Sequence, residues 1–464
     1  GAGYRAAGLG PGRVVALTQG GPVLHQLVAM LALARIGAVQ VVLPLDDPAE
    51  VRAAVAARVG VSAVAGERPG RGLDDLPLVP LDRAWLAAGA RAPEPVRTPG
   101  GDAPWMIVHT SGTTGAPKAA AISHRMEIDR IALLPAFFRY APGDRLASLV
   151  PVAFRVTRSV ALKCLSMGGT FIAMPPNLAS AAAIDLVERA GVGVLMTTPS
   201  QLADLLPSMP EDRPRLPALR VLRTTAGAIP AATVAAVRRR ISPNLYVDYG
   251  TNDAGSIAVA TPADLDRHPD TVGRPFERLQ VEVVDPLGRP LPAGIEGEIR
   301  LRGPGVTAGY IGDPAATAQA HRRGWFHPGD RGRFSSDGLL FITGRTDEIM
   351  NVAGLKVAPA EIEAVLASHA AVAEAAAFAL PSDRDQDVPA VAIRLHPVTA
   401  ADRPTAADLR RFAVERLGPR GPRYLLIVRA IPCDSLGKIQ RHRLADMLRT
   451  ALAARSVRRE AVSA

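Results

Sequence analysis

Helical and strand-like apolar patterns alternate over the first 280 residues, and this alternation constrains the fold most. Residues 23–45 combine an apolar helix with a strand near 39–44, and a second helix over 49–59 precedes a strand over 61–65. Further strands are predicted at 105–109, 170–174, 192–196 and 219–222. Such alternation is typical of an α/β fold with a parallel sheet. The region 76–104, rich in Pro and Gly, is predicted as a surface connection.

The pattern changes after residue 279. Short strands separated by turns are predicted at 279–284, 297–302 and 338–343 and indicate a β-rich subdomain. From residue 344 on, a small α+β unit is predicted, with helices at 359–368 and 405–417 and strands at 372–380, 388–396 and 424–430. Because 464 residues exceed what one hydrophobic core usually organises, more than one domain is expected.

Composition excludes several classes of protein. The formal charge of +10 comes from arginines spread along the whole chain, whereas a nucleic-acid binder gathers its basic residues on one element. Cys164 and Cys433 are the only cysteines, which excludes a disulfide framework and a Cys-rich zinc site. No apolar stretch is long enough to span a bilayer. The start, Gly1–Arg5, does not resemble a signal peptide and indicates processing or truncation, so a cytoplasmic protein is expected.

The segment from His109 to Lys118 carries the clearest chemistry. An apolar strand leads into six consecutive Ser, Thr and Gly residues, and a lysine follows. Glycines let backbone N–H groups approach an anion, hydroxyls add donors, and the lysine adds charge. Pro117 before the lysine rules out the P-loop pattern. The phosphate-binding residues predicted here are Thr110, Ser111, Gly112, Thr113, Thr114, Gly115 and Lys118.

This segment resembles the Thr-Ser-Gly-Thr-Thr-Gly-x-Pro-Lys signature of the adenylate-forming superfamily of acyl-CoA synthetases, peptide-synthetase adenylation domains and luciferases. The match is complete through Lys118, and Ala119 replaces the usual glycine. The other signatures follow in order, although the first few dozen residues of the family have no counterpart. The resemblance implies ATP and Mg²⁺. It also implies a large N-terminal domain of layered α/β subdomains plus a β-rich subdomain (1–343), a hinge (344–349) and a small mobile C-terminal domain (350–464).

Tyr249–Asp253 is similar to the family motif Tyr-Gly-x-Thr-Glu, in which tyrosine packs on adenine, threonine contacts the α-phosphate and glutamate holds Mg²⁺. Here Asn252 and Asp253 occupy the last two places. Asn can donate to phosphate, and Asp is a hard oxygen ligand whose shorter side chain favours metal contact through water. The resemblance implies further nucleotide contacts from Ala226, Gly227, Ala228, Asp248, Tyr249, Gly250 and Thr251.

Three later motifs also match. By resemblance, Asp330 binds the ribose hydroxyls, Arg345 contacts the nucleotide, and Asp347 is the pivot of the small domain. Gly354 lies near the channel for the accepting thiol, and Lys356 faces the nucleotide or the rotated surface. Lys438 bridges the carboxylate and the α-phosphate, because an anionic nucleophile needs a cation to approach phosphorus. The chain has only four lysines, and three of them, Lys118, Lys356 and Lys438, fall on positions that are lysine or cationic in the family. Because the chain otherwise uses arginine, this placement indicates that an ammonium group is needed at these positions.

The substrate is less constrained. Phe154 and Arg155 occupy the place of a Phe-Asp pair in amino-acid adenylation domains, so the reversed charge disfavours an α-amino acid. Arg155 and Arg158 face either the substrate pocket or solvent. The first hypothesis is a small or aromatic carboxylic acid, transferred to CoA or to the phosphopantetheine of a carrier protein. A second is a diazotase that activates nitrite for an aryl amine. A third, a non-catalytic nucleotide-binding relative, predicts the loss of Lys438, Asp330 or the Mg²⁺ carboxylate, and all three are present.

Overall fold

The computed structural model describes residues 4–5, 7–18, 21–90, 99–110, 117–175, 178–352, 355–381, 387–396, 403–434 and 438–462. The chain forms two compact units. The first unit comprises Gly1–Glu282 and Arg300–Pro328, and the second comprises Val283–Ile299 and Gly329–Ala464. The predicted hinge, 344–349, lies within the second unit, and the domain boundaries expected from the sequence stay a prediction.

A six-stranded sheet with the order β4-β3-β1-β2-β5-β6 forms the first layer of the first unit. Its strands are parallel except for β6, which runs antiparallel to β5. The strands are β1 (Val14–Leu17), β2 (Val39–Val42), β3 (Val61–Gly66), β4 (Leu78–Pro80), β5 (Pro104–Thr110) and β6 (Lys118–Ser123), with helices α2 (Val23–Arg35), α3 (Ala49–Val59) and α4 (Arg83–Ala90) between them. Buried aliphatic residues of α2, β1 and β5 form one core on this sheet.

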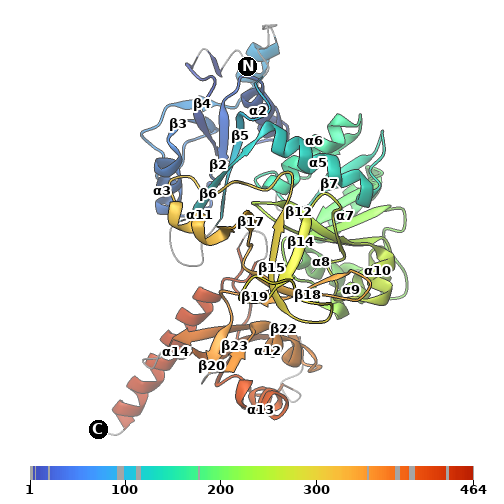
Figure 1. Cartoon of the computed structure of the whole chain (residues 1–464), viewed down its shortest axis with the longest axis vertical. Coiled ribbons are helices and arrows are strands. Elements are labelled where there is room, and N and C mark those ends of the chain that lie inside the picture. Colours follow the sequence, from blue (N-terminus) through green and yellow to red (C-terminus); the bar gives the residue numbers. More distant parts are fainter. Residues whose placement is uncertain are drawn as a thin grey trace. The chain divides into compact units, whose positions relative to one another are not determined.

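A seven-stranded sheet with the order β13-β12-β11-β10-β9-β7-β8 forms the second layer (Figure 1). Strands β7 to β11 are parallel to one another, and β12 runs antiparallel to β11. The strands are β7 (Arg145–Ser148), β8 (Thr170–Ile172), β9 (Val194–Thr197), β10 (Val221–Thr225), β11 (Leu245–Thr251), β12 (Gly255–Ala260) and β13 (Arg274–Pro275). The helices are α5 (His124–Phe138), α6 (Arg155–Ser166), α7 (Ser180–Arg189), α8 (Pro199–Leu205), η1 (Leu206–Ser208), α9 (Ala231–Arg240) and α10 (Pro262–Arg267).

The β-rich region is a sheet with the order β16-β17-β15-β18-β19, in which β14 also pairs with β15. Its elements are β14 (Gln280–Val284), β15 (Gly297–Arg302), α11 (Pro314–Ala320), β16 (His321–Arg322), β17 (Trp325–Phe326), β18 (Asp330–Phe334) and β19 (Leu340–Arg345). The chain then continues through β20 (Met350–Val352), β21 (Leu355–Val357), α12 (Pro359–Ala367), β22 (Val372–Pro381), β23 (Asp387–Leu395), α13 (Ala406–Leu417), η2 (Gly418–Arg420), β24 (Tyr424–Ile427) and α14 (Arg441–Val462).

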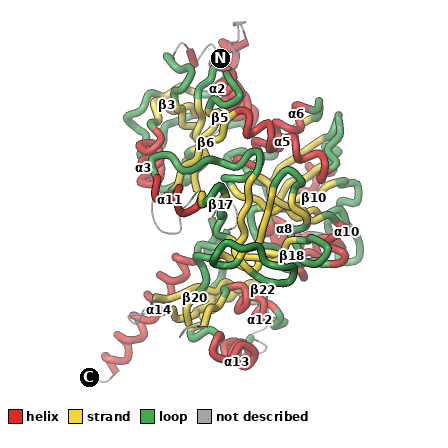
Figure 2. Tube along the Cα trace, viewed as in Figure 1, coloured by secondary structure: helices red, strands yellow, loops and turns green. Residues whose placement is uncertain are grey.

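The predicted α/β class is confirmed, and the strand-rich region after 279 and the α+β region after 344 are visible in Figure 2. The prediction that 76–104 is a surface connection is wrong for residues 78–90. Within it, β4 extends the first sheet and α4 brings Trp85 against Tyr4, with ring centroids 5.3 Å apart. Both elements are too short to produce a readable apolar period. Among the described helices, none is long and apolar enough to cross a bilayer.

Candidate functional site

The hairpin of β5 and β6 positions the predicted phosphate-binding lysine. Thr110 ends β5 directly opposite Lys118, the first residue of β6. The Lys118 ammonium lies 5.4 Å from the centroid of the Tyr310 ring, within the range of a cation–π contact. The predictions for Ser111, Gly112, Thr113, Thr114 and Gly115 lie outside the described residues.

Asp253 occupies the turn between β11 and β12, and its side chain is buried. The Thr307 hydroxyl donates to Asp253 Oδ1 over 3.0 Å, and the Thr307 N–H donates to the Asp253 carbonyl over 2.9 Å. The neighbouring Asn252 amide donates to the carbonyl of His109, at the end of β5, over 3.3 Å. The two residues that replace Thr-Glu of the family motif are therefore held beside the strand that leads to the phosphate-binding segment.

Arg130 on α5 fixes this turn and was not found from the sequence. Its Nη2 donates to the carbonyl of Asp253 over 2.5 Å, and its Nε donates to the carbonyl of Gly305 over 2.8 Å. A Cβ at Gly305 would lie 2.9 Å from Arg130 Cγ, and one at Gly255 would lie 3.1 Å from its Cδ. Both positions therefore need glycine. No local pattern distinguishes Arg130 from the other arginines, because its partners lie more than 100 residues away.

Burial and the neighbouring charges act in opposite directions on the pKa of Asp253. Burial raises the pKa of Asp253 above its ordinary value, while the Thr307 hydroxyl and the nearby charges of Arg130, His321 and Lys118 act to lower it. A hydrogen bond to the charged form and nearby cations favour the carboxylate. The surroundings therefore hold a buried carboxylate whose charge a bound cation would stabilise further.

The predicted adenine loop follows β10. Ala226, Gly227 and Ala228 are exposed, and Ala226 has a φ of 75°, a left-handed conformation that alanine rarely adopts. Backbone strain of this kind persists where the surroundings enforce it and is concentrated at functional sites. Tyr249, Gly250 and Thr251 end the neighbouring strand β11, so the two predicted adenine contacts lie on adjacent strands of one sheet.

Asp248 takes part in a buried ion pair. Its Oδ2 accepts hydrogen bonds from Nε and Nη2 of Arg223 and from the Ser256 hydroxyl, and both partners of the pair are 1% exposed. The Arg223 guanidinium also lies 4.3 Å from the centroid of the Phe138 ring. This geometry gives Asp248 a structural role, and its nucleotide contact stays a prediction.

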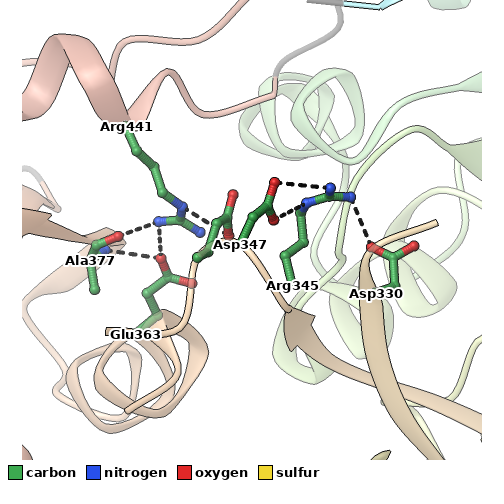
Figure 3. A network of polar contacts seen from close by, with 7 residues as sticks. Asp330, Arg345, Asp347, Glu363, Ala377 and Arg441 are labelled. Carbon is green, nitrogen blue, oxygen red and sulfur yellow. Dashed lines mark hydrogen bonds and ion pairs between the residues drawn. The ribbon is translucent and has the colours of Figure 1, made fainter. Parts of the chain in front are cut away.

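In the second unit, Arg345 lies between the predicted ribose ligand and the predicted pivot (Figure 3). Its Nη1 donates to Asp330 Oδ1 over 3.1 Å, and its Nε and Nη2 donate to the carboxylate of Asp347 over 2.8 and 3.2 Å. Burial alone would lower the pKa of Arg345, but its hydrogen bond to Asp347 and the charge of Asp330 raise that pKa. Residues of two separately predicted motifs, Asp330 of one and Arg345 and Asp347 of the other, therefore form one hydrogen-bonded chain.

A second arginine anchors the last helix beside this chain. Arg441, the first residue of α14, donates from Nη1 to Glu363 Oε1 over 2.6 Å and to the carbonyl of Ala377 (Figure 3). Its Nε lies 3.2 Å from Glu348 Oε2. Glu348 directly follows Asp347, so the helix that comes after the Lys438 loop is tied to the segment predicted as the hinge.

The remaining predicted lysines lie on short turns. Lys438 is exposed; its N–H donates to Asp434 Oδ1 and its carbonyl accepts from the Asp434 N–H, each over 2.9 Å. Lys356 lies in β21, and its side chain is not described, while Gly354 lies outside the described residues.

The predicted substrate residues begin helix α6. Phe154 precedes the helix and packs against the first core. Arg158 is buried and the Arg155 side chain is only 10% exposed, so neither side chain points into solvent. Their contact with substrate stays a prediction.

Comparison with known proteins decides the family. The model of the AMP-binding enzyme matches residues 1–311, about two thirds of the chain, and that of the AMP-binding enzyme C-terminal domain matches 361–438. The chain belongs to the AMP-binding enzyme family. The predicted membership of the adenylate-forming superfamily is thereby confirmed.

Individual members of the AMP-binding family extend this result. The chain is 29% identical over 95% of its length to a sulfoacetate–CoA ligase of Cupriavidus necator, and the match spans 89% of that protein. It is 27% identical to a probable CoA ligase of Humulus lupulus over 74% of its length but only 65% of that ligase. The structure of the amide bond synthetase McbA from Marinactinospora thermotolerans superposes with a TM-score of 0.84 at 26% identity, covering 96% and 92% of the two chains.

Among the described residues, a metal ion would find few protein ligands. No group of three or more His, Cys, Asp or Glu side chains suited to a metal occurs in the described part of the chain. Mg²⁺ commonly binds one or two carboxylates together with substrate phosphates. The buried carboxylate of Asp253, close to Lys118, fits that mode of binding.

Proposed function

We propose that the chain catalyses ATP-dependent adenylation of a small or aromatic carboxylic acid, with release of pyrophosphate. The activated acyl group is then transferred to a thiol, that of CoA or of a carrier-protein phosphopantetheine. The observation that carries the proposal is the Asp253 turn, held by Thr307 and Arg130 beside the Lys118 hairpin. The names of the related CoA ligases support the thiol step.

In the proposed first half-reaction, Lys118 and the segment 110–115 hold the phosphates, and Asn252 donates to the α-phosphate. Asp253 would hold Mg²⁺, which supplies charge neutralisation on the phosphates. Asp330 accepts hydrogen bonds from the ribose diol. Lys438 places its ammonium between the attacking carboxylate and the phosphorus, where it offsets the repulsion of two anions. The carboxylate oxygen bonds to the α-phosphorus, and the bond to pyrophosphate breaks.

In the proposed second half-reaction, the small domain turns about Asp347 and withdraws Lys438. The region of Gly354 and Lys356 then serves the thiol, which attacks the acyl carbon and releases AMP. Alternation of this kind lets one site carry out two reactions with different catalytic groups.

Pyrophosphate release from ATP tests the proposal. Aryl, aliphatic and dicarboxylic acids are each supplied alone and with CoA, and sodium nitrite is supplied with and without aryl amines. Release that depends on one acid, with AMP and a thioester as products, supports the ligase. Pyrophosphate release that depends on nitrite overturns the ligase proposal and supports the diazotase hypothesis instead. If pyrophosphate is released with an acid and an amine but not with CoA, the second step is amide bond formation, the reaction for which the amide bond synthetase McbA is named.

A further inference from the structure

Three buried arginines surround one carboxylate between α5 and α6, which lie side by side in Figure 1. Arg130 and Arg158 are each 5% exposed, the Arg155 side chain is 10% exposed, and Glu127 is 2% exposed. Glu127 accepts a hydrogen bond from the Ser159 hydroxyl and lies 4.0 Å from Nη1 of Arg155. One carboxylate cannot neutralise three guanidinium groups.

Hydrogen-bond donors in this cluster outnumber acceptors. Gln40 on β2 joins the cluster by accepting a hydrogen bond from Arg158 Nη1 at its Oε1 over 3.4 Å. Among the described residues, four buried donors of the cluster have no hydrogen-bond partner: Arg130 Nη1, Arg155 Nε, Arg158 Nε and Gln40 Nε2. The buried acceptors without a partner are Glu127 Oε2 and, near Arg155, Asp248 Oδ1. Buried polar atoms are normally paired, and leaving one unpaired costs free energy. A ligand that supplies several acceptors and negative charge would satisfy the cluster.

The other carboxylates nearby do not remove the imbalance. Arg155 lies within electrostatic range of Asp248 and Asp253 as well as Glu127. Asp248 Oδ2 is paired with Arg223, although Asp248 Oδ1 is a buried acceptor without a hydrogen-bond partner, and Asp253 is turned towards the Thr307 hydroxyl. Four guanidinium groups thus face three carboxylates in the described residues, and the positive excess grows when Asp253 holds a cation.

Arg130 and Arg158 keep their charge at neutral pH. Burial lowers the pKa of Arg130 to about 9 and that of Arg158 to about 10, and both values stay above 7. Buried water could pair with the free N–H groups, but it would leave the charge uncompensated. An oxyanion provides both the hydrogen-bond acceptors and the negative charge.

We propose that the cluster of Arg130, Arg155 and Arg158 recognises an oxyanion of the substrate other than the triphosphate of ATP. Its source is a second carboxylate or sulfonate on the acid that is adenylated, or free nitrite. Planar guanidinium groups suit such anions because they donate paired hydrogen bonds. This inference rests on the proposed adenylation and specifies its substrate class.

Matched substrate pairs test the proposal. Succinate is compared with butanoate, phthalate with benzoate, and sodium nitrite with sodium chloride in the pyrophosphate-release assay at constant ionic strength. We expect kcat/KM for the dianionic member to exceed that of its partner by at least about 100-fold, because a site built for polar groups rejects analogues that lack them. A preference for nitrite identifies the free oxyanion as the source. Equal use of both members of every pair overturns the proposal while leaving adenylation intact.

Variants separate recognition from folding. Arg155→Gln is expected to lower kcat/KM for the preferred anion by about 100-fold and to lower kcat/KM for a monoacid much less. Arg155→Lys, which keeps the charge but loses the planar fork, recovers part of the loss. Lys163→Gln on the same helix is the matched control. Equal losses with dianionic and monoanionic acids show a structural role and reject the proposal.

A binding measurement distinguishes failure of this inference from failure of adenylation. The thermal unfolding midpoint of the full chain is followed with succinate, phthalate or nitrite against chloride. Stabilisation of the wild type that is lost in Arg155→Gln supports an oxyanion site even if no acid releases pyrophosphate. The absence of any anion-dependent stabilisation, together with an active monoacid ligase, overturns it.

Discussion

The predicted metal ligand Asp253 is held in place by residues far away in the sequence. Its carboxylate receives one hydroxyl hydrogen bond from Thr307, and its main chain is held by Arg130. The motif in which Asp253 lies could be found from the sequence because its residues are contiguous. Thr307 and Arg130 could not, because they lie 54 and 123 residues away and belong to no recognisable motif.

Replacing Thr307 by Val removes a hydrogen bond to the charged form of Asp253 and so raises the pKa of that carboxyl further. With a raised pKa, Asp253 stays protonated up to a higher pH, and the protonated carboxyl does not hold a cation. We expect the acidic half-maximum of pyrophosphate release to move up by about 0.7 pH, equivalent to one hydrogen bond of ~1 kcal/mol. The pH–rate profile at several Mg²⁺ concentrations measures this shift.

Thr271→Val serves as the control for Thr307→Val, because Thr271 is equally buried and its hydroxyl accepts from the N–H of Gly273. An acidic limb that moves equally in both variants would mean that Asp253 does not set it.

The Lys438→Ala change tests the division of work between the two half-reactions. Without the ammonium, repulsion between the carboxylate and the phosphate is uncompensated, so adenylate formation is expected to fall by about 100-fold or more. Thioester formation from a supplied acyl adenylate is expected to stay largely intact. Lys163→Ala is the control, and equal losses in both half-reactions would contradict the assigned role.

At the scale of elements, strand order explains why distant motifs converge. Thr110, the β10 loop and the end of β11 all lie at the carboxyl ends of strands that are parallel within their own sheets, where ligands commonly bind in α/β folds. Apolar periodicity predicted most of these strands because each is almost wholly buried. It could not predict β4 or α4, where few residues are buried. Nor could it predict the charged interior between α5 and α6, because the residues buried there are largely polar.

The buried pair of Arg223 on β10 and Asp248 on β11 ties two adjacent strands together. Arg223→Met leaves the Asp248 carboxylate buried without its partner, so we expect the free energy of unfolding to fall by about 3–5 kcal/mol. Urea denaturation measures the change. The double variant Arg223→Met/Asp248→Asn should recover part of it.

Arg215→Met is the comparison for the Arg223 pair, because Arg215 pairs with Glu188 at the surface, and a change within about 1 kcal/mol is expected. A loss of similar size in the two single variants would show that burial of the Arg223 pair is unimportant.

At the scale of the whole molecule, the proposed reaction requires the segment 344–349 to change conformation. The side chain of Asp347 is bonded to Arg345, which also holds Asp330, while Arg441 contacts the adjacent Glu348. Motif spacing placed Arg345 and Asp347 in one signature, but it gave no indication that Asp330 and Arg441 join them.

Asp347→Pro restricts the backbone at the predicted pivot, since proline fixes φ near −65°. We expect one conformer to be trapped, with adenylate formation and thioester formation affected very unequally. Separate assays of the two half-reactions measure this. Asp347→Ser, which loses the bond to Arg345 but keeps backbone freedom, is the control. Normal thioester formation in Asp347→Pro would show that rotation at this residue is not required.

The two thiols of the chain differ in a way that makes the Lys438 loop accessible to spectroscopy. Cys433 is exposed and pairs across the turn with Ile439, next to Lys438, whereas Cys164 is buried in α6. A maleimide fluorophore added to the wild-type protein should therefore react at Cys433 in preference to Cys164. The loop predicted to leave the nucleotide between half-reactions carries its own labelling handle, so its movement can be timed during turnover by stopped-flow fluorescence without introducing a cysteine.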